Sequence, residues 1–260
     1  MEDPFAEPAD TREAILGAAF RALCEHGYAE LTIKRIGEGF DKSPSLVYHH
    51  YDGKDELLVD LLEFLLDRFE SALSADAFDL PPRTRLDAYV AAMTDPGSVG
   101  ADHTPDGRFL TALVELRAQA ATDEAYRTHF DRSDRVFQTF LEKSVREAAA
   151  DLDIEGDDST AGATDRSGTT TDSETPNASG AAAGSRTPTD SDVTGPCAAA
   201  GTPDELGPVT PAEVAATLQA LSAGAMLRWT TTNDREWVPT VRQGIGRYLT
   251  QTLPAVDPEA

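Results

Sequence analysis

The spacing of the apolar residues constrains this chain more than any other feature. Large apolar side chains recur every three or four positions from about residue 11 to residue 150, and again from 211 to 253. This is the period of amphipathic helices. No segment alternates apolar and polar residues over a useful length, as a half-buried strand does. The sequence therefore predicts an all-α protein.

Residues 151–207 interrupt the helical pattern. They consist mainly of Asp, Ser, Thr, Gly, Ala and Pro, with no aromatic residue and almost no large aliphatic one. Such a stretch cannot bury enough apolar surface to offset the conformational entropy of ordering it. We expect a disordered acidic insertion between two helices that pack together. The remaining chain divides into residues 1–55 and a second helical region, 56–150 with 208–256.

Helix start signals recur in the first 55 residues, at Asp10 or Thr11, at Thr32, at Ser43 before Pro44, and at Asp52. Glu13 stands where it can complete a capping box if Asp10 is the cap. Gly27 is expected to stop the first helix, and the third helix ends near Tyr51. Three helices in roughly forty residues, the last two joined by a tight turn, are typical of a helix-turn-helix domain.

Longer helices follow this domain. The apolar stripes predict helices from Asp52 to before Leu80, from Thr84 to about Thr94, from Arg108 onward, from about Asp123 to Ala150, from Pro211 to about Trp229, and around Val241 to Leu249.

The charge balance is strongly acidic. Acidic residues outnumber basic ones 46 to 22, the net charge is -24, and lysine is scarce. Such a surface suits a cytosol rich in salt, where hydrated carboxylates keep a protein soluble and long-range repulsion is screened. The alternative is an ordinary acidic protein with an acidic tail. In either case net charge gives no support to nucleic-acid binding, which must rest on local placement.

Two lysines are placed suggestively. Lys34 and Lys54 each stand two residues beyond a proposed cap, Thr32 or Asp52. A cation in the first turn opposes the helix dipole and costs up to about 1 kcal/mol. That placement makes sense if a phosphate docks there, because helix N-termini also offer free backbone N–H groups. The alternative is two ordinary exposed lysines.

The short third helix lies between these lysines and could enter a major groove. Val47 and Tyr51, four residues apart, are expected to face inward. The outward side then carries Ser45, Leu46, Tyr48 and His49. These side chains suit base edges, a thymine methyl group or phosphates. For Tyr48 and His50 the alternative is a layer covering the small core.

These residues resemble a known family. The run Thr11-Arg-Glu-Ala-Ile-Leu-Gly-Ala-Ala-Phe and the run from Ser43 to Leu58, with its Tyr-His-His-Tyr segment followed by Lys and Leu-Leu, are similar to the N-terminal domain of TetR/AcrR-type transcriptional regulators. The resemblance covers about residues 11–60. Two departures are Asp41-Lys42 in the turn, where the family usually has Gly and an apolar residue, and Leu46, where Thr is common. The candidate DNA-binding residues, from the resemblance and from the outward face together, are Thr32, Lys34, Ser43, Pro44, Ser45, Leu46, Tyr48, His49, His50 and Lys54.

The resemblance also implies an architecture and a mechanism. The second helical region would bind a small, lipophilic effector and form a homodimer, with segments near 123–149 and 211–230 pairing across a two-fold axis. Such a dimer would bind a palindromic operator on double-stranded DNA. Effector binding would shift the helix that begins near Lys54 and release the repressor.

Residues that could line an effector pocket are large and apolar: Phe64, Met93, Phe109, Leu113, Phe137, Met226 and Trp229. Each could equally be part of a plain core. Asp102, His103 and Asp106 could hold a metal. Asp102 and His103 are adjacent, however, and the group lacks a third spaced ligand, so no metal site is predicted. No catalytic motif or cofactor fingerprint occurs, so we expect neither an enzyme nor a cofactor.

The N-terminus lacks the features of a signal peptide, and no apolar run is long enough to cross a bilayer. We therefore expect a cytoplasmic protein without membrane contact. A second interpretation remains open at this point: a helical ligand-binding or interaction module whose helix-turn-helix no longer binds DNA.

Overall fold

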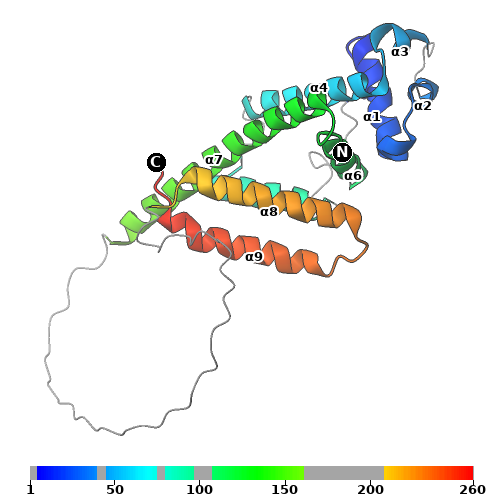
Figure 1. Cartoon of the computed structure of the whole chain (residues 1–260). Helices are drawn as coiled ribbons and strands as arrows, with labels where there is room; N and C mark the ends of the chain where they lie inside the picture. The colour runs from blue at the N-terminus through cyan, green and yellow to red at the C-terminus, as the bar shows by residue number, and fades with distance from the viewer. Residues whose placement is uncertain (1–4, 40–44, 75–79, 97–106, 161–207, 260) are drawn as a thin grey trace, which may run out of the picture. The chain divides into compact units, whose positions relative to one another are not determined.

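The computed structural model describes residues 5–39, 45–74, 80–96, 107–160 and 208–259, and within these only the backbone at 72–74 and 153–160 (Figure 1). Almost all of the described residues lie in helices, and the one isolated β-bridge among them joins Val209 to Val256. The predicted all-α class is confirmed. Within the same ranges, none of the helices is both long and apolar enough to span a membrane.

The N-terminal domain contains three helices and the start of a fourth: α1 (Thr11–Glu30), α2 (Ile33–Glu38), α3 (Ser45–His50) and α4 (Lys54–Ser74). Asp10 caps α1 by accepting the N–H of Glu13, whose own carboxylate accepts the N–H of Ala9 at 2.7 Å. Gly27 leaves helical geometry at φ 71°, as predicted, although helical turns resume and α1 continues to Glu30. A positive φ favours glycine because other residues clash there.

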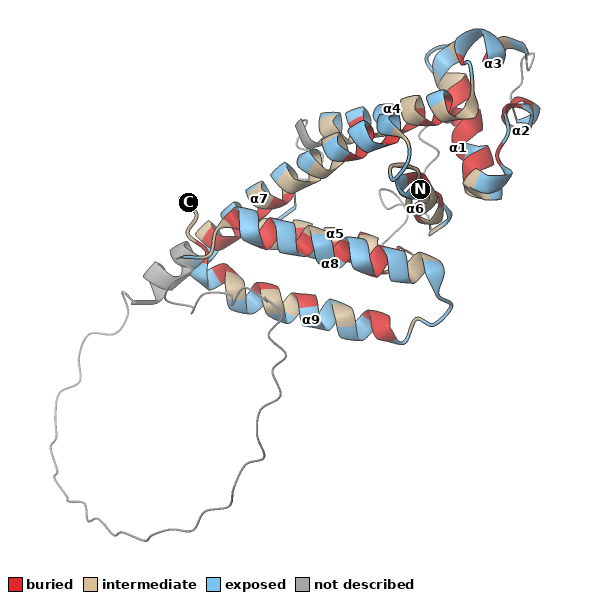
Figure 2. Cartoon of the chain, in the orientation of Figure 1, coloured by how far each residue is buried: buried red, intermediate tan, exposed pale blue. Residues whose placement is uncertain are grey.

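One apolar core holds this domain together. It is built from α1, α2, α3 and the first half of α4, and its fully buried members include Ile15, Leu16, Leu23, Ile36, Val47, Leu57, Leu58 and Leu61 (Figure 2). Side chains from α6 and α7 join the same core, among them Leu116 and Tyr126. Hydrophobic burial therefore ties the helix-turn-helix to the helices that follow it.

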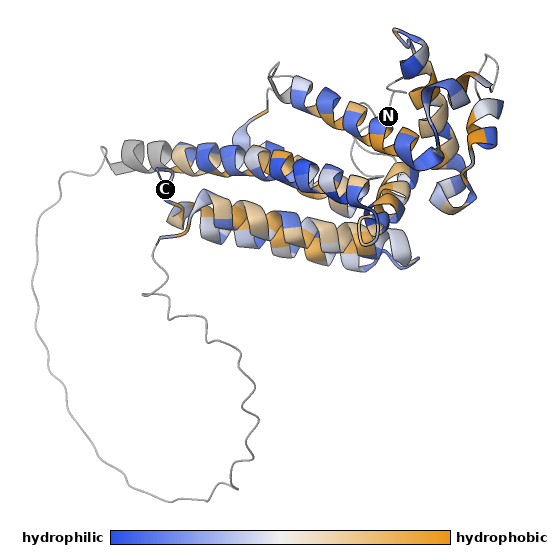
Figure 3. Cartoon of the chain, turned by 45° about the horizontal axis from the view of Figure 1, so that its top comes forward, coloured by the Kyte–Doolittle hydropathy of each residue, from blue (hydrophilic) through white to orange (hydrophobic). Residues whose placement is uncertain are grey.

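The second helical region consists of α5 (Pro82–Thr94), α6 (Gly107–Gln119), α7 (Glu124–Thr160), α8 (Pro211–Thr231), α9 (Trp237–Thr252) and the 3₁₀ turn η2 (Leu253–Ala255). Its main core joins α5, α7, α8 and α9 through Leu86, Leu141, Val145, Val214, Leu218, Ile245 and Leu249. Hydrophilic and hydrophobic residues alternate along the long helices, as amphipathic packing requires (Figure 3).

Several predicted boundaries were wrong. The helix expected to end near Ala150 continues as α7 to Thr160. No proline lies between 124 and 160, so nothing forces a stop once the helix has been nucleated. Helix α5 begins at Pro82 rather than Thr84, because proline is well suited to the first helical turn. Helix α4 begins at Lys54, two residues beyond the expected cap Asp52, whose N–H is accepted by Glu56 at 2.7 Å.

Residues 154–207 form a unit separate from the rest of the chain. The expected disorder of the insertion concerns mainly residues 161–207, which lie outside the described ranges. The chain returns to described structure before α8, where Thr210 and Glu213 form a reciprocal capping box. This box fixes the start of α8.

The side of α8 that faces away from the core is uncharged over about three turns. Ala216, Ala220, Ala223, Gly224 and Leu227 are all exposed there. Leu227 keeps 51% of its surface accessible, and no atom lies within 4 Å of a Cβ placed on Gly224. We call these five residues the α8 stripe. An uncharged surface is unusual on a chain whose net charge is -24.

Candidate nucleic-acid interface

Helix α3 presents a polar and aromatic face to solvent. Val47 is fully buried and Tyr51, just after the helix, is 7% exposed, so the inward side is as predicted. Ser45, Tyr48 and His49 point outward, and Tyr48 keeps 62% of its surface exposed. A tyrosine left this exposed contributes little to the core, so packing within the described residues does not account for it.

Leu46 and His50 differ from each other in burial. Leu46 is half-buried and packs against the N-terminal core. His50 is exposed, and its ring centroid lies 6.3 Å from that of Tyr51. We call Ser45, Tyr48, His49 and His50 the recognition face. Ser43 and Pro44, the other two candidates near this helix, lie outside the described residues.

Polar contacts help to fix the orientation of α3. The Tyr51 hydroxyl donates to Asp60 on α4 at 2.5 Å, and Arg12 on α1 donates to the same carboxylate at 2.9 Å. Burial raises the pKa of Tyr51, and its bond to Asp60 adds to the effect. Because three elements share one carboxylate, α3 is anchored to α1 and α4 rather than only packed on them.

Helix α2 carries the first expected phosphate contact. Thr32 is the N-cap, and its hydroxyl accepts the N–H of Arg35 at 3.2 Å. The side chain of Lys34 is 84% exposed and pairs with Glu38 at 3.9 Å. An exposed pair of this kind is worth about 0.5 kcal/mol or less. Lys34 can therefore exchange Glu38 for a phosphate at little cost.

Lys54 is in a different environment. Its ammonium donates to the carbonyl of Tyr28 at 3.1 Å and lies 4.0 Å from the centre of the Tyr28 ring. A half-buried ammonium over an aromatic face is held by electrostatic attraction to the ring. The two lysines expected to be equivalent are thus not equivalent. Lys54 is the first residue of α4, and its contacts with Tyr28 place its side chain against the end of α1.

A polar cluster that the sequence pattern does not reveal lies where α1 and α4 meet α6 and α7. The carboxylate of Asp55 accepts the hydroxyls of Tyr28 at 2.9 Å and of Tyr126 at 3.0 Å. Glu115 on α6 accepts the N–H of Tyr28 at 2.6 Å. We call Tyr28, Asp55, Glu115 and Tyr126 the junction cluster. It joins α1 and α4 of the N-terminal domain to α6 and α7 of the second region.

Burial perturbs the tyrosines of this cluster. It raises the pKa of Tyr28 to about 12, with the bond to Asp55 as the second cause. Tyr126 is 1% exposed, and burial raises its pKa as well, with the charge of Asp55 adding to the effect. Both hydroxyls therefore remain protonated donors at neutral pH, which is the form that a carboxylate partner requires.

The seven expected pocket residues fall into separate groups. Phe64, Phe109 and Leu113 pack against the N-terminal core, where Phe64 stacks on Phe5 with centroids 5.1 Å apart. Phe137 packs against Phe69 at 4.7 Å and Tyr89 at 6.2 Å. These rings touch one another, so they fill space as core residues do.

The other three expected pocket residues lie on α5 and α8. Met93 is half-buried, Met226 is 7% exposed, and the ring of Trp229 crosses the start of α6, 2.3 Å from where a Cβ on Gly107 would stand. The one cleft that can be described in detail lies elsewhere, between α5 and α9, and none of the seven residues lines it.

Three buried side-chain atoms in the second region lack a hydrogen-bond partner among the described residues: Nε of Arg85, whose Nη2 donates to Glu147, and one atom each of His129 and Ser222. His129 is 5% exposed with Nδ1 unpartnered, and burial lowers its pKa to about 4, so it is neutral at pH 7. Ser222 is fully buried with its hydroxyl unpartnered. The hydroxyl of Tyr89 lies close to Ser222 but outside ordinary hydrogen-bond geometry. Unpartnered buried polar atoms are uncommon in proteins.

Comparisons with known proteins agree with this geometry. Residues 15–61 match the model of a family described as bacterial regulatory proteins, tetR family. Over 140 residues the chain is 36% identical to the HTH-type transcriptional repressor AcnR of Corynebacterium efficiens, covering 54% of this chain and 64% of that repressor. It is 31% identical to the HTH-type transcriptional regulator BetI of Brucella anthropi over 86 residues, 33% of this chain and 44% of that regulator. The chain thus spans less than two thirds of the length of these curated relatives.

Solved structures share the fold over nearly the whole chain. A TetR transcription regulator from Haloarcula marismortui superposes with a TM-score of 0.57 at 24% identity, covering 93% of this chain and 97% of that one. A putative transcriptional regulator from Saccharomonospora viridis, solved in complex with choline, gives a TM-score of 0.56 at 14% identity, with 92% and 95% covered. At these identities the likeness establishes the fold: an N-terminal helix-turn-helix domain followed by a helical body.

Proposed function

We infer, from a helix-turn-helix domain of the tetR family on a helical body with the fold of such regulators, that this protein is a DNA-binding transcriptional regulator. The observation that carries the inference is α3. Val47 and Tyr51 anchor it from within, and Tyr48 projects outward with 62% of its surface exposed. A rigid short helix with a polar outer face fits a major groove.

Each candidate residue then has a role in DNA binding. Ser45, Tyr48, His49 and His50 meet base edges or the phosphates flanking them. Thr32 and Lys34 at the start of α2 hold the DNA backbone. Lys34 supplies one counter-charge to a phosphate. Lys54 acts indirectly, by fixing the end of α1 through Tyr28. Ser43, Pro44 and Leu46 belong to the same proposed surface.

The α8 stripe supports a homodimer. Small residues let two helices approach closely. Two uncharged stripes can also come into contact without the like-charge repulsion that other surfaces of this strongly acidic protein would cause. The pairing helix proposed here is α8, rather than the segment near 123–149. A two-fold dimer presents two α3 helices, which implies a palindromic operator.

The second helical region is the proposed effector domain. Its aromatic cluster (Phe69, Tyr89, Phe137 and Phe140) and two of the unpartnered buried polar groups, His129 and Ser222, support a small, largely apolar effector with one or two hydrogen-bonding atoms. Effector binding would move α6 or α7 and, through the junction cluster, reorient α1 and α4. The regulator would then be a repressor that the effector releases from DNA.

The composition adds a proposal about conditions. A net charge of -24 suits a protein that works in concentrated salt. Salt screens the repulsion between its carboxylates and DNA, so operator affinity should fall only slightly, or even rise, as KCl is added. A steep conventional loss of affinity from low salt would contradict this proposal.

The test is footprinting on the DNA upstream of the protein's own gene, followed by affinity measurements on the protected site. Lys34→Gln should weaken operator binding about fivefold to tenfold, the effect of one lost phosphate contact. Lys143→Gln is a matched control, because Lys143 is also an exposed lysine in a 3.9 Å pair with a glutamate four residues on. If no site is protected and the parent chain binds no DNA, the chain is a helical ligand-binding module. If both variants bind the protected site like the parent chain, Lys34 makes no phosphate contact.

A further inference from the structure

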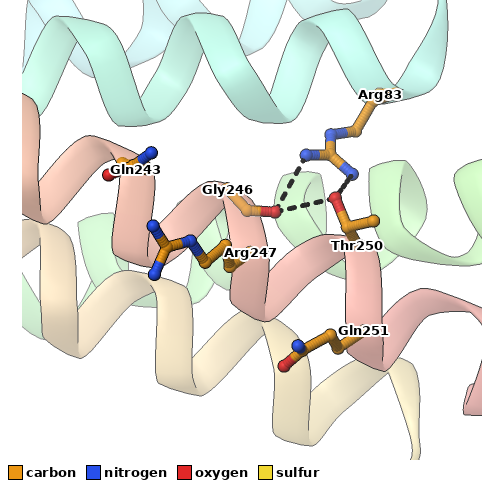
Figure 4. Close-up of a pocket in the computed structure, with 6 residues that line it drawn as sticks. All are labelled: Arg83, Gln243, Gly246, Arg247, Thr250 and Gln251. Carbon is orange, nitrogen blue, oxygen red and sulfur yellow. Dashed lines mark hydrogen bonds between the residues drawn. The ribbon is translucent and has the colours of Figure 1, made fainter.

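A cleft of about 400 Å³ lies where α5 meets α9, at some distance in sequence from the DNA-binding domain. Six residues line it: Arg83, Gln243, Gly246, Arg247, Thr250 and Gln251 (Figure 4). The lining contains two guanidinium groups, two amides and a hydroxyl, but no carboxylate. On a chain with 46 acidic residues, a cleft whose lining has two arginines and no carboxylate is a local exception to the acidic surface.

Arg83 is held in place within the cleft. Its Nε lies 3.3 Å from both carboxylate oxygens of Asp87, and its Nη2 donates to the carbonyl of Gly246 at 3.3 Å. Its Nη1 lies 3.5 Å from the hydroxyl of Thr250 (Figure 4). These contacts use three of the five N–H groups of a guanidinium. The remaining donors are presented from a fixed position, so little conformational entropy is lost when an anion binds them.

Arg247 provides the second charge. It is exposed and stands beside Gln243 in the cleft (Figure 4). In the described ranges, the arginines make ion pairs, hydrogen bonds or ring contacts with the exception of Arg247 and Arg135. No acidic residue occurs on α9, from Trp237 to Thr252. With carboxylates in twofold excess over basic residues, an arginine on an acid-free helix is available to an external anion.

We propose that this cleft binds a small oxyanion, with phosphate or carboxylate groups held between Arg83 and Arg247. A planar guanidinium matches both groups by paired N–H···O contacts. Gln243, Gln251 and Thr250 supply further donors around the rim. A volume of about 400 Å³ falls within the range of small-molecule sites, roughly 300 to 1,000 Å³, so a molecule carrying one or two such groups fits.

The protein's own charge sets the conditions under which this site operates. A net charge of -24 repels anions at long range, and salt reduces that repulsion. The contacts to Arg83 and Arg247 are short-range and less screened. Occupancy should therefore remain high at a salt concentration that would weaken a site dependent on long-range attraction.

The test is isothermal titration of the full-length chain with pyrophosphate, with inorganic phosphate, and with succinate as the carboxylate probe. We expect one site per chain. Arg247→Gln should weaken binding of the best probe about tenfold, the effect of one charge-assisted hydrogen bond. Arg135→Gln removes an equally exposed arginine outside the cleft and should leave binding unchanged.

A second variant tests the shape of the cleft without altering its charge. No atom lies within 4 Å of a Cβ on Gly246 or on Gly244, and of the two only Gly246 lines the cleft. Gly246→Leu should fill it and abolish binding, whereas Gly244→Leu should preserve binding. Both replacements favour the helical state, since glycine costs about 1 kcal/mol relative to alanine within a helix.

Three results would overturn the proposal. One is failure of all three probes to bind the parent chain. Another is equal loss of binding in the Arg135 and Arg247 variants. The third is that Arg247→Gln leaves anion binding intact but weakens self-association in sedimentation experiments, which would assign the arginine to contact with a second copy. Operator binding is measured separately, so none of these results bears on the proposed DNA-binding function.

Discussion

The recognition face lies in the N-terminal domain and the junction cluster joins that domain to the second helical region, and the two use polar side chains in opposite ways. On the recognition face, Tyr48 and its neighbours are exposed, and Tyr48 keeps 62% of its surface accessible. In the junction cluster, one carboxylate accepts two tyrosine hydroxyls that burial keeps protonated. The exposed polar groups of the recognition face can contact another molecule. The polar groups of the junction cluster are hydrogen-bonded to one another and stabilise the fold that presents the recognition face.

The two lysines carry the same lesson. Lys34 and Lys54 stand in the first turns of α2 and α4 and look alike in the sequence. One has an exposed side chain with a weak partner, and the other is bound to a backbone carbonyl and a tyrosine ring. Burial and existing partners, more than position in a helix, decide whether a lysine ammonium is available to contact a DNA phosphate.

The largest expected effect is on the junction. Asp55→Ala removes the shared acceptor and leaves the hydroxyls of Tyr28 and Tyr126 without a charged partner. The free energy of unfolding should fall by about 2 to 4 kcal/mol, from the loss of two hydrogen bonds to a charged group. Urea denaturation measures it. Asp131→Ala, at an exposed aspartate on α7, is the control. Equal losses of unfolding free energy in both variants would show that the junction cluster stabilises the fold no more than an exposed aspartate does.

The next comparison separates the two lysines. Lys34→Gln should weaken operator binding while leaving stability within about 0.5 kcal/mol, because an exposed pair contributes little. Lys54→Gln should lower the free energy of unfolding by about 1 kcal/mol through loss of its contacts with Tyr28. Affinity and denaturation measured on both variants decide the matter. Equal stability of the two variants would mean that the Tyr28 contact is not a stabilising one.

The smallest expected effect is a pH dependence of the junction. The folded protein holds the pKa of Tyr28 at about 12, above the ordinary value near 10. The folded state therefore keeps a proton that the unfolded state releases. Stability from this group is fully present below about pH 10 and is lost as the pH rises toward 12. Tyr28→Phe cannot ionise, so its alkaline loss should be shallower. Denaturation midpoints at pH 9 to 11.5, in constant salt, test this.

Much of the fold follows from local chemistry. The periods of the apolar residues located the helices, and the caps at Asp10 and Thr32 fall where side-chain preference puts them. The four-residue spacing of Val47 and Tyr51 correctly assigned the inner side of α3, because a helix fixes which residues share a face. The error at the end of α7 came where no local signal stops a helix, whereas the error at the start of α5 came from overlooking Pro82.

The partners of individual polar groups could not be predicted in the same way. Asp55 in a first helical turn looks like an ordinary N-terminal carboxylate, and its tyrosines come from positions 28 and 126. The cleft between α5 and α9 joins Arg83 to residues more than 150 positions away. Such contacts depend on how helices are placed in space, which local pattern does not specify.

The sequence by itself determined that this chain is helical, that it has an N-terminal helix-turn-helix, and which side of α3 faces outward. Each of these depends on interactions between residues a few positions apart. Only the tertiary structure decided that Lys34 is available and Lys54 engaged, that Asp55 joins two helical regions, and that Arg83 and Arg247 share a cleft. Those outcomes depend on the burial and pairing of groups that folding brings together from distant parts of the chain.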